Sequence, residues 1–328
     1  MSRRYVNQLC DQEAVNEVYV ATGKQLRPNR NGNLYLQFEL FDRTGRITGR
    51  LWNAGDAVYQ AFENGDYVRV EGTAQLFQGA MQLIATKLVK VDPAEIQSED
   101  FVMLPAVAVD KLLGRMRELL QTVTDPGLAT LAECYLMDEN LMERLCLAPA
   151  GLKTHHAYPG GLLEHVVTLM DVASRISPCY PMIDRDLLVV GALVHDISKV
   201  DELDYDREIG YTDEGQLIGH LVMGVRVLED KVEEAEKLSG EPLDQEKLLR
   251  LKHIVISHHG QYEFGSPKLP MTLEAVTLAF LDNMDAKIAQ FHQHMQDDPN
   301  HQSSWTVYNP NLQRKLFKGK PKKDDGVD

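Results

Sequence analysis

Apolar and polar residues alternate through much of the first 91 positions, which is the pattern of strands with one buried face. The alternation is clearest in residues 33–41, where one face would carry Leu34, Leu36, Phe38 and Leu40. Other segments favour strands at 14–26, 46–52, 67–76 and 80–91, and a short helix at 54–63. The pattern therefore predicts five strands, with a helix after the third.

Turn-forming residues separate these predicted strands. Residues 42–45 (Asp-Arg-Thr-Gly) lie between the second and third strands, and residues 64–66 (Asn-Gly-Asp) precede the fourth. This order of strands, short helix and closing hairpin is that of an OB-fold barrel. We therefore predict an OB-fold domain over residues 14–91.

Apolar residues at helical spacing replace the alternation after residue 105. Seven segments have this spacing: 107–123, 126–136, 161–176, 186–200, 220–238, 244–258 and 272–294. Residues 92–105 are predicted to be a linker, and residues 201–219 a polar loop. The second domain is thus predicted to be all-α over residues 106–310, followed by a basic, flexible tail over residues 311–328.

Cysteine usage and hydropathy indicate a cytoplasmic protein. The four cysteines form no Cys-x-x-Cys pair, which fits a reducing compartment better than a disulfide framework. The N-terminus lacks the apolar core of a secretory signal. No apolar run approaches the roughly 20 residues that a membrane helix needs, so we expect no contact with a membrane.

The net charge of −15 argues against binding nucleic acid through bulk charge. The charge is unevenly distributed, however. Residues 1–91 contain 11 Lys and Arg against 9 Asp and Glu, whereas the remainder contains 23 against 40. Nucleic acid would therefore need a local groove, and the acidic remainder suits carboxylate ligands for a metal.

Histidine and aspartate interrupt the apolar helical stripes at several positions. They are His165, His195, Asp196, His220, His258, His259 and Asp282. A buried imidazole or carboxylate is unfavourable unless it is satisfied, and one such residue is usually a satisfied core group. A set of this size instead indicates a metal site. The adjacent His-Asp pair would let the carboxylate bridge two ions, an arrangement suited to phosphodiester hydrolysis.

The ordered set resembles a known superfamily. The order His165, His195-Asp196 and Asp282 resembles the signature of the HD-domain metal-dependent phosphohydrolases. More closely, the segments HHAYPGGLLEHV, LVHDISKV, GHLVMGV, SHHGQYEFGSP and FLDNMDAK behind a barrel are similar to the YhaM-type 3′→5′ exoribonucleases. This resemblance covers roughly residues 14–318.

The resemblance implies a site for two divalent ions. The first ion would be held by His165, His195, Asp196 and Asp282, and the second by Asp196, His220 and His258, with His259 as the alternative to His258. Mn²⁺ is the expected ion, and Mg²⁺, Fe²⁺ or Co²⁺ stay open, as does a single-ion site. The nucleophile would be a metal-bound hydroxide, and the products 5′-mononucleotides.

Four neighbouring residues have two interpretations each. Lys199 either neutralises a phosphate or positions the nucleophile in a catalytic role, or it is a solvated helix residue. His155 and His156 either contact the substrate or pack their loop. Asp285, one turn from Asp282, is expected to be a supporting or surface residue rather than a ligand.

The outward face of the barrel carries residue types that bind single strands by stacking and charge. These are Tyr35, Phe41, Arg46, Arg50 and Trp52, with Phe77 at the last hairpin. The alternative for Phe41 and Trp52 is packing under the linker or against the helical domain.

Together these features predict a metal-dependent phosphodiesterase, a 3′→5′ exoribonuclease acting on single-stranded RNA. Single-stranded DNA as a second substrate and a homo-oligomeric state stay open. The alternatives are an HD-type nucleotidase or phosphodiesterase on small nucleotides, and a non-catalytic OB-fold nucleic-acid-binding factor. A cyclic-dinucleotide phosphodiesterase is disfavoured, because the pattern HHExxDGxGYP is missing after His258.

Overall fold

The computed structural model describes residues 3–77, 80–101, 104–152, 156–205, 209–296, 298, 300 and 303–319. These residues divide into two compact units, each with its own hydrophobic core. The barrel unit comprises the described residues up to 101 and those from 290 onward, and the helical unit comprises 104–205 and 209–289. The sequence-based boundaries stay predictions, but residues 290–310, assigned above to the helices, group with the barrel.

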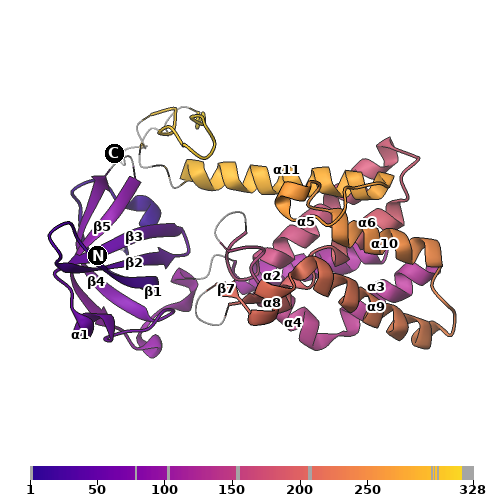
Figure 1. Ribbon diagram of the computed structural model, residues 1–328, viewed down its shortest axis with the longest axis horizontal. Helices are drawn as coiled ribbons and strands as arrows, with labels where there is room; N and C mark the ends of the chain where they lie inside the picture. The colour runs from indigo at the N-terminus through magenta and orange to yellow at the C-terminus, as the bar shows by residue number, and fades with distance from the viewer. Residues whose placement is uncertain are drawn as a thin grey trace, which may run out of the picture. The chain divides into compact units, whose positions relative to one another are not determined.

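The barrel has the predicted OB-fold order, closing as β1-β2-β3-β5-β4 (Figure 1). Its strands are β1 (Ala14–Pro28), β2 (Leu34–Asp42), β3 (Gly45–Trp52), β4 (Tyr67–Phe77) and β5 (Ala80–Lys90). The short helix α1 (Asp56–Tyr59) follows β3 as expected. Strands β3 and β5 pair in parallel, and the other neighbours pair antiparallel.

The alternation in β2 directs its aliphatic face into the barrel. Leu36, Phe38 and Leu40 are fully buried, as predicted, but Leu34 at the strand's first position is 41% exposed. Opposite Phe38 in the register lies Gly49. A Cβ at Gly49 would lie 2.2 Å from the Phe38 ring, so only glycine leaves room for this ring in the core.

The predicted linker is partly structured. It contains the 3-10 turns η2 (Pro93–Glu95) and η3 (Ser98–Asp100), and Phe101 beyond them is buried. Phe101 packs with Val18 and Val20 of β1 in a small second cluster. A third 3-10 turn, η1 (Val6–Gln8), precedes the barrel.

The helical unit contains the helices that the 3.6-residue spacing predicted, with several additions. Its main elements are α2 (Ala106–Leu120), α3 (Pro126–Met137), α4 (Glu139–Leu147), α5 (Gly161–Ile176), α6 (Arg185–Val194), α7 (Lys199–Glu202), α8 (Asp213–Leu217), α9 (His220–Ser239), α10 (Gln245–Ser257) and α11 (Leu273–Gln296). The residues of α11 from Gln290 onward group with the barrel unit. Helix α4 was not predicted. The predicted loop at 201–219 contains α8 and the strands β6 (Leu203–Asp204) and β7 (Gly210–Tyr211).

The single helix predicted over residues 186–200 is wrong. Helix α6 ends at Val194, residues 195–198 form a non-helical turn, and α7 begins at Lys199. Residues 186–194 are all buried, so the apolar spacing identified the helix correctly but contained no signal for its end. The break occurs at His195 and Asp196.

The tail predicted to be flexible from residue 311 is ordered as far as residue 319, where it belongs to the barrel unit. Leu316 within it is 5% exposed. Residues 320–328 of that prediction lie outside the described residues.

Candidate metal centre and nucleic-acid surface

Among the described residues, ligand atoms of the helical unit converge in three groups. Two of them contain the predicted ligands, and His165, His195 and Asp282 form the first of these two. His165 lies on α5, His195 directly follows α6, and Asp282 lies on α11. The Nε2 atoms of His165 and His195 are 3.3 Å apart, and His165 Nε2 is 3.4 Å from Oδ1 of Asp282. Three elements far apart in sequence therefore bring these side chains together.

The second group is formed by Asp196, His220, His258 and His259. Oδ1 of Asp196 is 3.2 Å from Nε2 of His258 and 3.4 Å from Nε2 of His220. Nε2 of His259 is 3.1 Å from Nε2 of His220. The sequence left open which of the adjacent histidines points inward, and the structure brings both to the group.

Asp196 lies between the two groups and faces each with a different oxygen. Its Oδ2 is 3.5 Å from Nε2 of His195 and 3.6 Å from Nε2 of His165, whereas its Oδ1 faces the second group. The side chain is almost fully buried. This is the geometry of a carboxylate able to bridge two neighbouring cations.

Backbone carbonyls fix the tautomer of three imidazoles. Nδ1 of His195, His258 and His259 each lies 2.8 or 2.9 Å from a backbone carbonyl oxygen. Because a carbonyl only accepts hydrogen bonds, Nδ1 must carry the proton and donate it. The lone pair of each Nε2 is therefore directed to the ligand groups.

Carboxylates hold the other two imidazoles. Nδ1 of His165 is 2.7 Å from Asp285, and Nδ1 of His220 is 2.8 Å from Glu202. Glu202 also accepts the backbone N–H of His220 at 2.9 Å. A carboxylate on the far nitrogen orients a metal-binding imidazole and raises its basicity. Asp285 was expected in such a supporting place because it lies one turn from the ligand Asp282, whereas no predicted ligand lies one turn from Glu202 and it was missed.

The donor atoms fit a divalent cation. Among the described residues, Oδ1 of Asp196 and Nε2 of His258 are buried without a hydrogen-bond partner. Buried polar atoms in this state are costly, so each needs an explanation. A cation between them would satisfy both atoms, and a mixed imidazole and carboxylate set suits Mn, Fe, Zn or Mg.

The protonation states also suit a metal site. Burial lowers the pKa of His195 to about 3, and burial together with neighbouring imidazoles lowers the pKa of His259 to about 4. Both side chains are therefore neutral at pH 7, the form that binds metal. Burial alone would lower the pKa of His165, but the carboxylates of Asp282 and Asp285 raise it to about 9. A metal at His165 would displace a proton.

Lys199 is held inside the site. Its Nζ lies 2.6 Å from Oδ2 of Asp196 and 3.0 Å from the carbonyl oxygen of Ala150, and its side chain is 13% exposed. The ammonium group therefore contacts the central carboxylate directly. A contact between Lys199 and substrate phosphate stays a prediction.

The loop before α5 contributes one of its two histidines. His155 lies outside the described residues. His156 has a left-handed backbone, with φ of 51°, and its Nε2 is 3.0 Å from the Asp285 carboxylate. Its Nδ1 is 3.0 Å from the hydroxyl of Tyr158. His156 thus contacts the carboxylate that holds His165, while its contact with substrate stays a prediction.

The predicted stacking residues of the barrel occupy two separate places. Tyr35 and Trp52 are paired across β2 and β3 with ring centroids 4.9 Å apart. Phe41 and Arg46 are also paired, with the guanidinium 5.5 Å from the ring. Six residues of strand separate the two pairs, which is about 20 Å.

The two places differ in exposure. Trp52 is 45% exposed and Phe77 48%, and the Arg50 guanidinium lies 5.9 Å from the Phe77 ring. Phe41 is half-buried and packs against the cluster around Phe101. Phe101 lies in the predicted linker, so this contact resembles the alternative prediction that Phe41 packs under the linker. Exposure therefore supports Trp52 and Phe77 as stacking residues, and the half-buried Tyr35 and Arg50 lie against them.

Both parts of the chain match known families. Residues 162–287 match the HD domain, and residues 19–91 match the OB-fold nucleic acid binding domain. With the fold and the His/Asp groups, these matches define the class: a hydrolytic enzyme of the HD-domain type that carries an N-terminal OB fold.

Whole-chain relatives narrow this class. The chain is 32% identical over 259 residues to the 3′-5′ exoribonuclease YhaM of Bacillus subtilis, covering 79% of this chain and 80% of that protein. It is 32% identical over 280 residues to the protein of the same name from Bacillus velezensis, covering 84% and 86%. The chain belongs to the YhaM family of 3′-5′ exoribonucleases.

None of the helices in the described part of the chain combines the length and the apolar character needed to cross a membrane.

Proposed function

We propose that this protein is a metal-dependent 3′→5′ exoribonuclease that hydrolyses single-stranded RNA to 5′-mononucleotides. The observation that carries the proposal is Asp196, whose two oxygens face two separate groups of histidine nitrogens at 3.2–3.6 Å. The named activity of the relatives supports the substrate and the polarity.

The site would hold two divalent cations, with Mn²⁺ as the first choice and Mg²⁺, Fe²⁺ and Co²⁺ as alternatives. The first group of ligands is His165, His195, Asp196 and Asp282, and the second is Asp196, His220, His258 and His259. His259 joins the predicted set because its Nε2 converges on His220. Cations there supply a water of lowered pKa and neutralise charge on the phosphate.

The chain's own residues prepare this chemistry. Lys199 neutralises part of the charge on Asp196 and keeps its carboxylate in one orientation. Asp285 and Glu202 hold His165 and His220 with Nε2 directed inward. The low solvent exposure of the groups strengthens each electrostatic contact.

The barrel would bind the strand that the helical unit hydrolyses. Tyr35 and Trp52 offer stacked rings and Arg50 offers a cation for the phosphate backbone. Stacking tolerates any base, which suits an enzyme that degrades a strand regardless of sequence. We also propose a cytoplasmic location, which the four free cysteines support.

The test is incubation of the full chain with single-stranded RNA and Mn²⁺, with and without a chelator. RNA labelled at the 3′ end should lose its label as a 5′-mononucleotide at the start, whereas RNA labelled at the 5′ end should shorten gradually. Asp196→Ala should reduce hydrolysis to the level of the chelated enzyme and leave the Kd for RNA unchanged. Asp230→Ala, an exposed aspartate on α9, is the control and should retain full activity.

Two results would overturn the proposal. Release of phosphate from mononucleotides, with no cleavage of RNA, would indicate the nucleotidase alternative. Tight RNA binding without metal-stimulated cleavage would indicate a non-catalytic binding factor. Single-stranded DNA run in parallel gives the preference between the two nucleic acids.

A further inference from the structure

Residues 303–319 form a hairpin that belongs to the barrel unit. Trp305 bridges to Phe317 and Asn309 bridges to Arg314 in antiparallel fashion. The backbone N–H of Thr306 donates to the carbonyl of Leu316 at 2.9 Å, and Lys318 pairs with Asp298. These contacts define a structure rather than a solvated tail.

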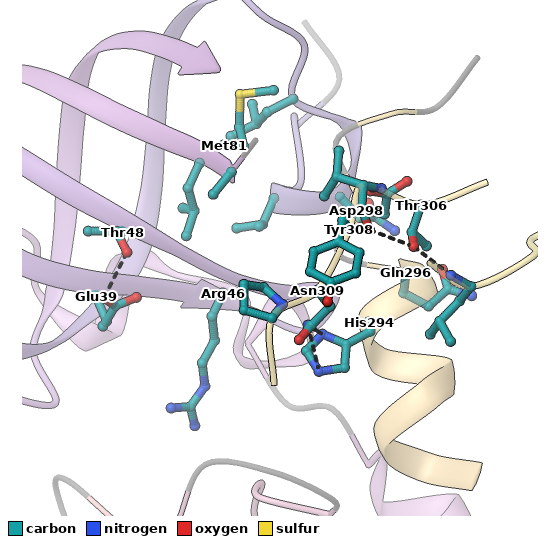
Figure 2. Close-up of a pocket in the computed structure, with 18 residues that line it drawn as sticks. Glu39, Arg46, Thr48, Met81, His294, Gln296, Asp298, Thr306, Tyr308 and Asn309 are labelled. Carbon is teal, nitrogen blue, oxygen red and sulfur yellow. Dashed lines mark hydrogen bonds between the residues drawn. The ribbon is translucent and has the colours of Figure 1, made fainter. Parts of the chain in front are cut away.

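A pocket of about 430 Å³ lies between this hairpin and the barrel (Figure 2). From the barrel it is lined by Glu39, Arg46, Thr48 and Met81, and from the C-terminal segment by His294, Tyr308 and Asn309. Figure 2 shows Tyr308, Asn309 and His294 grouped on the side of the C-terminal segment. The volume falls within the range of small-molecule and cofactor sites.

The lining favours a neutral, flat ligand over an anion. Two carboxylates line the pocket: Glu39, which accepts a hydrogen bond from Thr48, and Asp298, which is paired with Lys318. The carboxylate of Glu39 would repel a phosphate placed inside, whereas Lys318 balances the charge of Asp298. Tyr308 offers a ring that is 56% exposed. The amide side chains of Asn7 and Gln296 also line the pocket and have the donors and acceptors that the edge of a base needs. The exposed side chain of Arg46 could meet the phosphate outside.

The hairpin also has the residue types of a single-strand-binding surface. Trp305 is 50% exposed and Phe317 is 57% exposed, and their rings are 5.0 Å apart. Arg314 and Lys315 in the same hairpin are exposed. Exposed rings with neighbouring cations are the means by which proteins bind single strands without sequence preference.

The pocket continues the strand-binding face of the barrel. Arg46, at its rim, is separated from Trp52 by six residues of β3, about 20 Å along one face. An OB fold occupies roughly 4–16 nucleotides of a single strand, so one strand can reach both places.

We propose that the hairpin adds a nucleobase subsite to the barrel, in which a base of single-stranded RNA stacks on Tyr308 within the pocket. The phosphate of that nucleotide lies outside, at Arg46. This inference rests on the proposed function, since RNA is the strand in question, but it concerns a site in the other compact unit.

The experiment measures the Kd for a fluorescently labelled single-stranded RNA in the full-length Asp196→Ala protein, which does not consume the ligand. Adding Tyr308→Ala should weaken binding about 5- to 150-fold, the loss of one stacked base. Tyr308→Phe keeps the ring and should bind like the parent. Tyr180→Ala removes a tyrosine of similar exposure, 52%, from the helical unit and should also bind like the parent.

If Tyr308→Ala disturbs the fold of the hairpin, a second measurement that leaves Tyr308 in place still tests the subsite. RNA containing 5-iodouridine, crosslinked by light to the Asp196→Ala protein, should attach to Tyr308 or to its hairpin neighbours Trp305 and Phe317. Unchanged affinity of Tyr308→Ala, or crosslinks confined to residues outside 303–319, would overturn the subsite. If the subsite is overturned but the wild-type protein still releases mononucleotides from RNA, the proposed function stands. A wild-type protein that does not cleave RNA would instead refute the proposed function.

Discussion

Glu202 and Asp285 have the same role at different histidines. Each places a carboxylate oxygen on the Nδ1 of an imidazole whose Nε2 points at a ligand group. Glu202 does so with two contacts, because the same oxygen also accepts the backbone N–H of His220 at the start of α9. The direction of His220 therefore depends on Glu202 rather than on the helix alone.

Glu202→Gln should weaken binding of the second Mn²⁺ by about 10- to 100-fold while the first ion binds normally. The amide can still accept the Nδ1 proton, but it lacks the charge that raises the basicity of Nε2. Isothermal titration with Mn²⁺ measures both sites. Glu233→Gln, an exposed position on α9, is the control, and equal Mn²⁺ affinities in both variants would show that Glu202 does not support the metal site.

At the scale of elements, the position of α6 is set by contacts at its first turn. Asp184 caps the helix by accepting the N–H of Leu187 at 3.0 Å. Asp186 accepts the backbone N–H groups of Thr124 and Asp125 at 2.7 and 2.9 Å, which joins α6 to the loop before α3. Since α6 leads directly into the turn with His195, this joint positions the metal ligands indirectly.

Asp186→Ala should lower the free energy of unfolding by about 1–3 kcal/mol at pH 7, because two partly buried N–H groups lose a charged acceptor. Burial raises the pKa of Asp186, but the hydrogen bonds from Asp125 and Thr124 outweigh it, and the pKa lies below its ordinary value. A carboxyl with a lowered folded-state pKa stabilises the protein above its unfolded-state pKa, and this stabilisation is lost as the pH falls through the folded value.

Urea unfolding at neutral pH and at stepwise lower pH measures this contribution. The difference between wild type and Asp186→Ala should shrink as the pH drops below about 4. A difference that stayed constant with pH would mean that packing, not the carboxylate, is responsible.

At the scale of the whole molecule, the two units carry separate tasks and separate spectroscopic signals. The chain contains two tryptophans, Trp52 and Trp305, and both belong to the barrel unit. Helices dominate the other unit, which also contains the proposed metal ligands. Tryptophan fluorescence therefore follows unfolding of the barrel unit, and far-UV circular dichroism mainly follows unfolding of the helical unit.

Mn²⁺ should raise the thermal midpoint seen by circular dichroism and leave the fluorescence midpoint unchanged. A ligand that binds only the folded state at about 100 times its Kd stabilises by about 2.7 kcal/mol. Asp196→Ala should abolish the rise. A rise of both midpoints together would indicate that the two units unfold as one cooperative structure.

Local patterns in the sequence determined much of this protein. The alternation in residues 33–41 placed Leu36, Phe38 and Leu40 in a barrel, because a strand turns every second side chain to the same face. The helical spacing located most helices, and His or Asp within apolar stripes identified the ligand candidates. These features depend on neighbours a few positions apart, which a sequence displays directly.

Only the tertiary structure decided which side chains far apart in the sequence come into contact. His165 and Asp282 meet over 117 positions, and Glu202 reaches His220, because helix packing brings their side chains together. Helix α6 ends before His195 in the folded structure, which the apolar spacing did not indicate. Both His258 and His259 lie in one group of ligand atoms, whereas the sequence allowed either one to be the ligand. The second half of the hairpin, from residue 311, was predicted to be part of a flexible tail, since Leu316 acquires its buried place only in the folded barrel unit.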